Sequence, residues 1–233
     1  MPDGAGWGRT GLNTSRNELL QEIYDRLLAV FGPQRWWPAE TPFEVILGAI
    51  LTQNTAWKNV ATAIGNLRRH DLLRFDSVCG LSAHELAVLI RSSGFYNEKA
   101  KKIKSFCNHI MTKWGGSLEE FLIQDMDTLR IDLLGIRGIG PETADSIVLY
   151  AAFKASFVVD TYTYRILYRH GWVEESISYE ELRDYFMGAL DPDVPLFQEF
   201  HALLVRTGHL YCRKKPLCDS CPLNVFFGPS SLV

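Results

Sequence analysis

Apolar residues recur along most of the chain at the spacing of one face of a helix. After Ser15 they occupy positions 19, 20, 23, 27 and 31, and after Thr41 they occupy positions 45, 46, 49 and 50. Such spacing of three and four residues is typical of amphipathic helices. No segment alternates convincingly between apolar and polar residues; residues 156–160 come nearest and are few. The pattern predicts an all-α fold of about ten helices.

Helix starts carry a signal of their own. A Ser or Thr followed three residues later by Glu has the spacing of a capping box. The pair occurs at Ser15/Glu18, Thr41/Glu44, Ser82/Glu85, Ser117/Glu120 and Ser178/Glu181. Each pair precedes an apolar helical pattern, so we expect a helix to begin after each of them.

A glycine turn lies between two helical patterns in residues 131–160. The first pattern leads into Gly138-Ile139-Gly140, and the second begins at Pro141. Proline suits the first helical position, because its missing N–H would have had no partner there. Bare N–H groups at a helix start suit a phosphate. A plain turn between two helices has the same pattern, so both interpretations stay open on this basis.

The same stretch reads GIGPETADSIVLY and then FVVDTYTYRI. It resembles the helix-hairpin-helix and the catalytic aspartate of the endonuclease III-like DNA glycosylases. The resemblance implies two helical lobes with a central cleft. It also implies that a hairpin with Gly138, Ile139, Gly140 and Thr143 holds a DNA phosphate, and that Asp160 lies beside the sugar of the target nucleotide.

The resemblance also divides the chain. The glycine-rich residues 1–14 would be a disordered tail, and residues 34–154 would form a six-helix lobe with the helix-hairpin-helix. Residues 15–33 would pack with residues 155–233 as a second helical lobe, which carries a C-terminal cysteine loop.

One position departs from the bifunctional members of this superfamily, which carry a lysine where this chain has Glu142. That lysine attacks the sugar as an amine and forms a Schiff base. A carboxylate cannot do so, and the sequence therefore predicts a monofunctional glycosylase without the usual lyase chemistry. Glu142 could attract a cationic base in the pocket, or it could favour its own helix N-terminus electrostatically.

Three further segments carry the resemblance: WWP at 36–38, LTQNT at 51–55 and SGFYNEKAK at 93–101. Together with Glu142 they look closest to the bacterial 3-methyladenine DNA glycosylase III group. On that resemblance Gln53 fills the gap left by an extruded base, and Trp36 and Trp57 stack on that base. Packing in the core is the alternative role for the tryptophans.

The chemistry gives a reason for each of these roles. Swinging a base out of the duplex costs a few kcal/mol, and stacking on an aromatic ring returns about 1–3 kcal/mol. A methylated purine such as 3-methyladenine is cationic, so a cation–π term of about 0.5–2 kcal/mol is added. Asp160 would stabilise the positive charge that develops on the sugar and could take a proton from the attacking water. It also suits a helix N-cap, and the two roles are compatible.

Composition adds bounds on location and partners. The chain has 233 residues, 47% apolar and 22% charged, with a formal net charge of -3. These values fit a soluble globular protein, and the charge argues mildly against indiscriminate coating of nucleic acid. There is no apolar run of the roughly 18 residues that a membrane span needs, and no signal-peptide core. We therefore expect a cytoplasmic protein without a membrane partner. The resemblance to the glycosylases implies that it acts, as a monomer, on double-stranded DNA containing a damaged base.

Three of the five cysteines, Cys212, Cys218 and Cys221, are grouped. Their spacing resembles the loop that holds a [4Fe–4S] cluster in many members of the superfamily, where four thiolates are normally required. The fourth cysteine is missing at about Phe227. A noncysteine ligand such as His209 could complete a cluster, zinc could bind instead, or the loop could be a metal-free relic.

Three functions compete on this sequence. The favoured one is a monofunctional base excision repair glycosylase, a hydrolase, for alkylated purines. The second is an endonuclease III-type glycosylase and AP lyase for oxidised pyrimidines or a mismatched base. The third is a noncatalytic helix-hairpin-helix module that only binds DNA. Asp160 argues against the third, because a binding module needs no carboxylate at the sugar, and Glu142 argues against the lyase.

Overall fold

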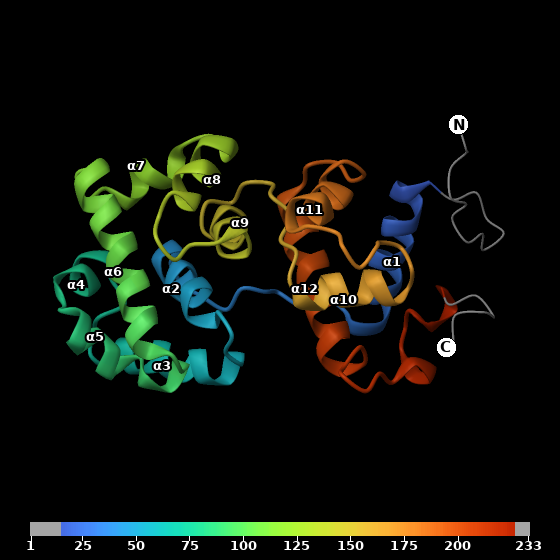
Figure 1. Ribbon diagram of the computed structural model, residues 1–233, viewed down its shortest axis with the longest axis horizontal. Helices are drawn as coiled ribbons and strands as arrows, with labels where there is room; N and C mark the ends of the chain where they lie inside the picture. Colours follow the sequence, from blue (N-terminus) through green and yellow to red (C-terminus); the bar gives the residue numbers. More distant parts are fainter. Residues whose placement is uncertain (1–14, 227–233) are drawn as a thin grey trace. The chain divides into compact units, whose positions relative to one another are not determined.

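The protein is described by a computed structural model over residues 15–226, which form helices joined by turns and contain no strand (Figure 1). The predicted all-α class is confirmed. The tail expected at residues 1–14 and the position of Phe227 lie outside the described residues. None of the helices within residues 15–226 is long and apolar enough to cross a membrane.

The chain divides into two compact units. The first unit contains, of the described residues, 15–34, 159–191 and 199–226, and the second unit contains residues 35–158 and 192–198. The second unit therefore carries the glycine turn and Trp36, Trp37 and Trp57. The first unit carries Asp160 and the grouped cysteines.

The second unit is built around α2 (Pro42–Thr52), whose residues 43–51 are all buried. A helix that is apolar on every side must be surrounded, and α2 contacts three other helices of the unit, α3, α6 and α9. The remaining elements are α3 (Trp57–Arg69), α4 (Phe75–Gly80), α5 (Ala83–Leu89), η1 (Arg91–Ser93), α6 (Tyr96–Lys113), α7 (Leu118–Ile123), α8 (Met126–Leu134) and α9 (Pro141–Tyr150).

The first unit contains α1 (Arg16–Phe31), α10 (Thr161–Arg169), α11 (Tyr179–Met187), most of α12 (Val194–Leu210), and the short η2 (Cys218–Ser220) and η3 (Asn224–Phe226). Aromatic side chains form the part of its core that surrounds Phe200, near the centre of α12. The ring of Phe200 lies 5.4 Å from that of Tyr24 on α1 and 5.7 Å from that of Phe186 on α11, both edge to face. Such pairs add about 0.5–1.5 kcal/mol each beyond burial.

The five predicted helix starts are confirmed. The side chains of Ser15, Thr41, Ser82, Ser117 and Ser178 each accept a hydrogen bond from the backbone N–H three residues later. The bond satisfies a donor that has no partner inside the helix. The reciprocal bond, from the backbone N–H of the N-cap residue to the Glu carboxylate, is present at Ser15, Ser82 and Ser178. The carboxylate of Glu44 accepts from the backbone N–H of Glu40 at 3.1 Å and from Arg68 Nη2 at 2.7 Å.

Candidate functional site

The turn between α8 and α9 leaves a helix start without a side-chain cap. Gly138 adopts a φ of 94°, in the region that favours glycine. Gly140 is the N-cap of α9, no side chain caps it, and Pro141 follows at the first helical position as predicted. Ile139 between the glycines is 5% exposed and anchors the turn in the core. The N–H groups at the start of α9 and the helix dipole together suit an anion.

Gly138 lies directly against the stem of Lys102 on α6. A Cβ atom at residue 138 would lie 2.5 Å from Lys102 Cγ, closer than any non-bonded contact allows. Glycine is therefore required for two reasons, its backbone conformation and the approach of the lysine. The lysine in turn packs under the hairpin and brings a positive charge close to the turn.

Gln53 at the end of α2 is bound to the hairpin. Its Nε2 donates to the backbone oxygen of Gly138 at 3.2 Å and to Thr143 Oγ1 at 2.9 Å. Its Oε1 accepts from Nζ of Lys102. The structure thus brings together three of the predicted DNA-binding residues, Gln53, Gly138 and Thr143, which are up to 90 positions apart in sequence.

A buried ion pair fixes α8 against α9. Arg130 Nε donates to Asp145 Oδ1 at 2.8 Å, and Arg130 Nη2 donates to Oδ2 at 3.1 Å. Asp145 is completely buried, and it also accepts from the hydroxyl of Ser156. A bidentate pair of this kind fixes orientation as well as distance. Ser156 belongs to the segment that leads to Asp160, four residues later.

Trp36 and Trp57 pack together with Trp37. Trp36 and Trp57 have ring centroids 4.7 Å apart, and Trp37 lies 5.5 Å from Trp57. All three rings are half-buried, which leaves part of each surface open to a ligand ring. The peptide bond between Trp36 and Trp37 is cis.

Trp37 also packs against two helices of the unit. Its ring lies 5.3 Å from that of Tyr150, and a Cβ atom at Gly48 would lie 2.9 Å from Trp37 Cζ2. Trp37 is therefore fitted against the central helix α2 and against α9, which supports a packing role for this residue.

Glu142 is exposed in the first turn of α9, two residues after the N-cap. A carboxylate there is favoured by the helix dipole. Its backbone oxygen accepts from Ser146 Oγ at 2.7 Å, inside the same helix. The position at which bifunctional members of the resembled superfamily carry their lysine thus holds a negative charge at the start of the hairpin's second helix.

Asp160, in the first unit, is the N-cap of α10, as its sequence context allowed. Its Oδ1 accepts from the N–H of Thr163 at 2.7 Å, and the side chain is half-buried. His201 on α12 is its electrostatic neighbour. Burial lowers the pKa of His201, and the nearby charge of Asp160 partly offsets that effect by raising it. A neutral imidazole is therefore expected beside the carboxylate at neutral pH.

Two lysines of α6 that support this region, Lys99 and Lys102, were not among the site residues predicted from the sequence. Lys99 is 2% exposed, and its Nζ donates to the backbone oxygens of Leu51 and Ser93, both at 2.7 Å. A signal was present in the sequence. Positions 99, 103, 106 and 110 lie on one helical face, and the last three are buried and apolar. A lysine in such a stripe indicates a buried cation with a specific partner.

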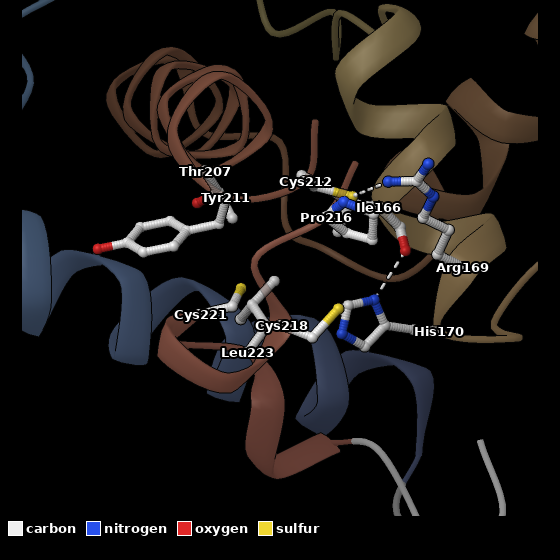
Figure 2. Close-up of a pocket in the computed structure, with 10 residues that line it drawn as sticks. All are labelled: Ile166, Arg169, His170, Thr207, Tyr211, Cys212, Pro216, Cys218, Cys221 and Leu223. Atoms are coloured by element: carbon white, nitrogen blue, oxygen red, sulfur yellow. Dashed lines mark hydrogen bonds between the residues drawn. The ribbon is translucent and has the colours of Figure 1, made fainter. Parts of the chain in front are cut away.

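The grouped cysteines of the first unit surround one small cavity (Figure 2). Cys212, Cys218 and Cys221 line it together with Arg169 and His170, and its volume is about 20 Å³. Arg169 Nη1 donates to Cys212 Sγ at 3.4 Å. Burial, followed by the neighbouring thiols, raises the pKa of Cys221.

This cavity does not fit a four-iron cluster. Its volume is about that of one water molecule, and within residues 15–226 there is no group of three or more His, Cys, Asp or Glu side chains arranged to hold a metal ion. His209, the candidate fourth ligand, does not line the cavity. No step of the chemistry below depends on a metal.

Comparisons with known proteins agree with the helix-hairpin-helix geometry. A family model described as the HhH-GPD superfamily of base excision DNA repair proteins matches residues 47–192. A protein of Methanocaldococcus jannaschii, named as a candidate DNA repair glycosylase, is 46% identical over 92% of this chain and 98% of its own length. Endonuclease III of Sulfolobus acidocaldarius is 30% identical over 78% of this chain and 79% of its own length.

Among solved structures, the 3-methyladenine DNA glycosylase of Helicobacter pylori, bound to 1,N6-ethenoadenine, superposes with a TM-score of 0.73 at 30% identity. The match covers 84% of this chain and 98% of that chain. The hairpin, the aspartate that follows it and the extent of these matches lead to one conclusion: the chain belongs to the HhH-GPD superfamily of base excision DNA repair proteins.

Proposed function

We propose that the protein is a monofunctional DNA glycosylase that hydrolyses the N-glycosidic bond of an alkylated purine in double-stranded DNA. The observation that carries the choice of substrate is the Trp36–Trp57 pair, with ring centroids 4.7 Å apart and both rings half-buried. Tryptophan faces favour a planar, electron-poor base, and a cationic one most of all. The structural similarity to a 3-methyladenine DNA glycosylase supports the same choice.

The reaction needs one carboxylate and one water. The C1′–N bond of the everted nucleotide breaks, and a cationic purine leaves as a neutral base with little acid assistance. Asp160 stabilises the oxocarbenium character of the sugar. The water oxygen then bonds to C1′, and the proton of the water passes to Asp160 or to solvent. The product is free base and an abasic site in an uncut strand.

The hairpin and Gln53 supply binding. The uncapped start of α9 at Gly140 suits a backbone phosphate, and the nearby Lys102 adds positive charge. Gln53 fills the gap in the duplex. Glu142 supports the monofunctional assignment, because a carboxylate cannot form the Schiff base that lyase chemistry requires.

A screen of damaged duplexes tests the proposal. Duplexes with 3-methyladenine, 1,N6-ethenoadenine, an oxidised pyrimidine or a mismatched thymine are incubated with the protein, and released base and strand cleavage are measured separately. We expect release of an alkylated purine without strand cleavage. Release of an oxidised pyrimidine with strand cleavage would support the second candidate function, an endonuclease III-type glycosylase and AP lyase. The 30% sequence identity to an endonuclease III favours that candidate. Binding of the duplexes without release of any base would leave the third function, a noncatalytic DNA-binding module.

A further inference from the structure

Lys99 is a buried lysine that has no carboxylate partner among residues 15–226. Its side chain uses all three N–H donors: it donates to the backbone oxygens of Leu51 and Ser93 at 2.7 Å each and to Thr55 Oγ1 at 2.5 Å. Burying an ammonium group is costly, and hydrogen bonds to neutral oxygens return only part of that cost. If folding stability alone mattered, we would expect a hydrophobic residue at position 99. The three hydrogen bonds of Lys99 therefore indicate a role in positioning the segments that they join.

The three acceptors belong to two turns that Lys99 ties together. Leu51 and Thr55 lie on either side of Gln53, and Ser93 ends η1. The hydroxyl of Thr55 donates to the backbone oxygen of Ser93 at 2.6 Å, which closes the connection between the two turns. The backbone that carries Gln53 is therefore held at both ends by one ammonium group.

The side chain of Gln53 is held by Lys102, which lies one turn after Lys99 on α6. Lys102 donates to Oε1 of Gln53, and Nε2 of Gln53 donates to the hairpin at Gly138 and Thr143. Lys99 thus fixes the backbone around Gln53, and Lys102 fixes its amide. The stem of Lys102 also supports the hairpin from below.

From this network we propose that Lys99 is a positioning residue that acts through Gln53. Its ammonium group fixes the turn of residues 51–55, so that the Gln53 amide is aligned with the hairpin and is placed to enter the gap left by an everted base. The inference rests on the proposed function, because it concerns the step in which a base leaves the duplex. Lys99 itself contacts neither DNA nor the reacting atoms.

The surroundings of Lys99 make this role depend on pH. Burial, followed by the charge of Lys102, lowers the pKa of Lys99 to about 8. The elements that pack against α6 carry other charged or titratable groups: Glu44 of α2, Asp76 and Cys79 of α4, His84 and Glu85 of α5, Arg91 of η1, Glu119 and Glu120 of α7, and Asp127, Arg130 and Asp132 of α8. In the described part of the chain, none of them forms an ion pair with Lys99. Above pH 8 Lys99 loses one of its three N–H donors and holds the turn less firmly.

A double-mutant cycle in the full-length protein tests the inference. Single-turnover base release from a damaged duplex is measured for wild type, Lys99→Met, Gln53→Ala and the double variant, with the Kd for undamaged duplex beside it. We expect Lys99→Met to slow release about tenfold while the Kd changes by less than about threefold. In the Gln53→Ala background the lysine substitution should have little further effect, because residues that act as a unit are not additive.

Lys104→Met is the matched control. Lys104 is a half-buried lysine of α6 that, like Lys99, donates to a backbone oxygen, but its partner is Cys79 on α4, away from the Gln53 turn. Its effect on release should be small. Between pH 7.5 and 9.5, wild type should lose activity in a step that Lys99→Met and Gln53→Ala both lack. Losses that add in the double variant, or an unchanged rate for Lys99→Met, would overturn the inference.

Thr55→Val provides a second route if Lys99→Met unfolds, because it keeps the lysine and removes one hydroxyl, which accepts from Lys99 and donates to the backbone oxygen of Ser93. It should slow release in the same non-additive way. Hydrogen exchange of residues 52–55 in the free protein gives a measurement that does not depend on catalysis, and Lys99→Met or Thr55→Val should accelerate it. If wild type releases no base from any duplex, the proposed function fails, and the exchange rates still decide whether Lys99 holds the turn.

Discussion

Gln53 at the end of α2 donates a 2.9 Å hydrogen bond to the hydroxyl of Thr143 in the first turn of α9. In the free protein, the residue proposed to fill the gap in the duplex is therefore attached to the hairpin proposed to bind the phosphate. Entry of Gln53 into DNA requires this bond and the one to Gly138 to break. On the proposed function, we expect these contacts to couple binding of DNA at the hairpin to removal of the base from the stack.

Trp57 and Trp37 are expected to differ when each is replaced by alanine. Trp57→Ala should slow release of a cationic purine by about tenfold or more, because stacking is worth about 1–3 kcal/mol, and should change stability little. Trp37→Ala should cost about 3 kcal/mol of stability, because this ring packs against Gly48 and Tyr150. Thermal unfolding and single-turnover release separate the two effects. Equal losses of stability would contradict the assignment of Trp57 to the pocket.

Glu142 leads us to expect no covalent adduct with DNA. The protein is mixed with a duplex that contains an abasic site, borohydride is added, and the products are separated under denaturing conditions. An amine nucleophile would be trapped as a stable conjugate, so an endonuclease III enzyme serves as the positive control. A strong adduct with this protein would show that another amine has taken over the role of the lysine.

Stability is expected to fall in mild acid because of two histidines, the buried His201 and the half-buried His170. Burial lowers the pKa of His201 and of His170 below the ordinary value of 6.5. Below pH 6.5 the unfolded chain binds protons that the folded chain does not, so the free energy of unfolding decreases as pH falls. The decrease approaches about 1.4 kcal/mol per pH unit for each histidine.

Thermal unfolding between pH 7.5 and 5 measures this slope. His201→Gln should make the midpoint less sensitive to pH across that range, while His84→Gln, an exposed histidine of α5, should leave the slope unchanged. A midpoint that stays constant down to pH 5 in the wild type would show that neither histidine is buried as a neutral group.

The cysteine loop is expected to fold without a four-iron cluster. Its three thiols surround a cavity of about 20 Å³, and Cys212 accepts from Arg169. Protein purified without oxygen should contain far fewer than the roughly four irons per chain that a cluster supplies. Measuring the iron and zinc content of the purified protein tests whether the loop holds a cluster. Iron at about four atoms per chain would mean that the loop opens and that a noncysteine ligand completes the site.

The sequence contained the signals for most of the helices and for the hairpin. Capping at Ser15 or Ser178 and the glycine turn at Gly138 depend on neighbours within a few residues, and local patterns report such contacts. The hydrogen bond of Lys99 with Leu51 and the electrostatic interaction of Asp160 with His201 join distant segments, so no local pattern predicts them. The lysine was detectable only as an anomaly in an apolar stripe, and its partners were not detectable at all.

Asp160 provides the most direct test of the catalytic account. Single-turnover release of an alkylated purine is compared for wild type and Asp160→Asn, with the Kd for the same duplex measured beside it. Asparagine can still cap α10 by accepting from Thr163, so folding and DNA binding should be kept. We expect the rate of base release to fall by about a hundredfold or more, because the charge that stabilises the sugar is removed. An unchanged rate with unchanged binding would contradict the account.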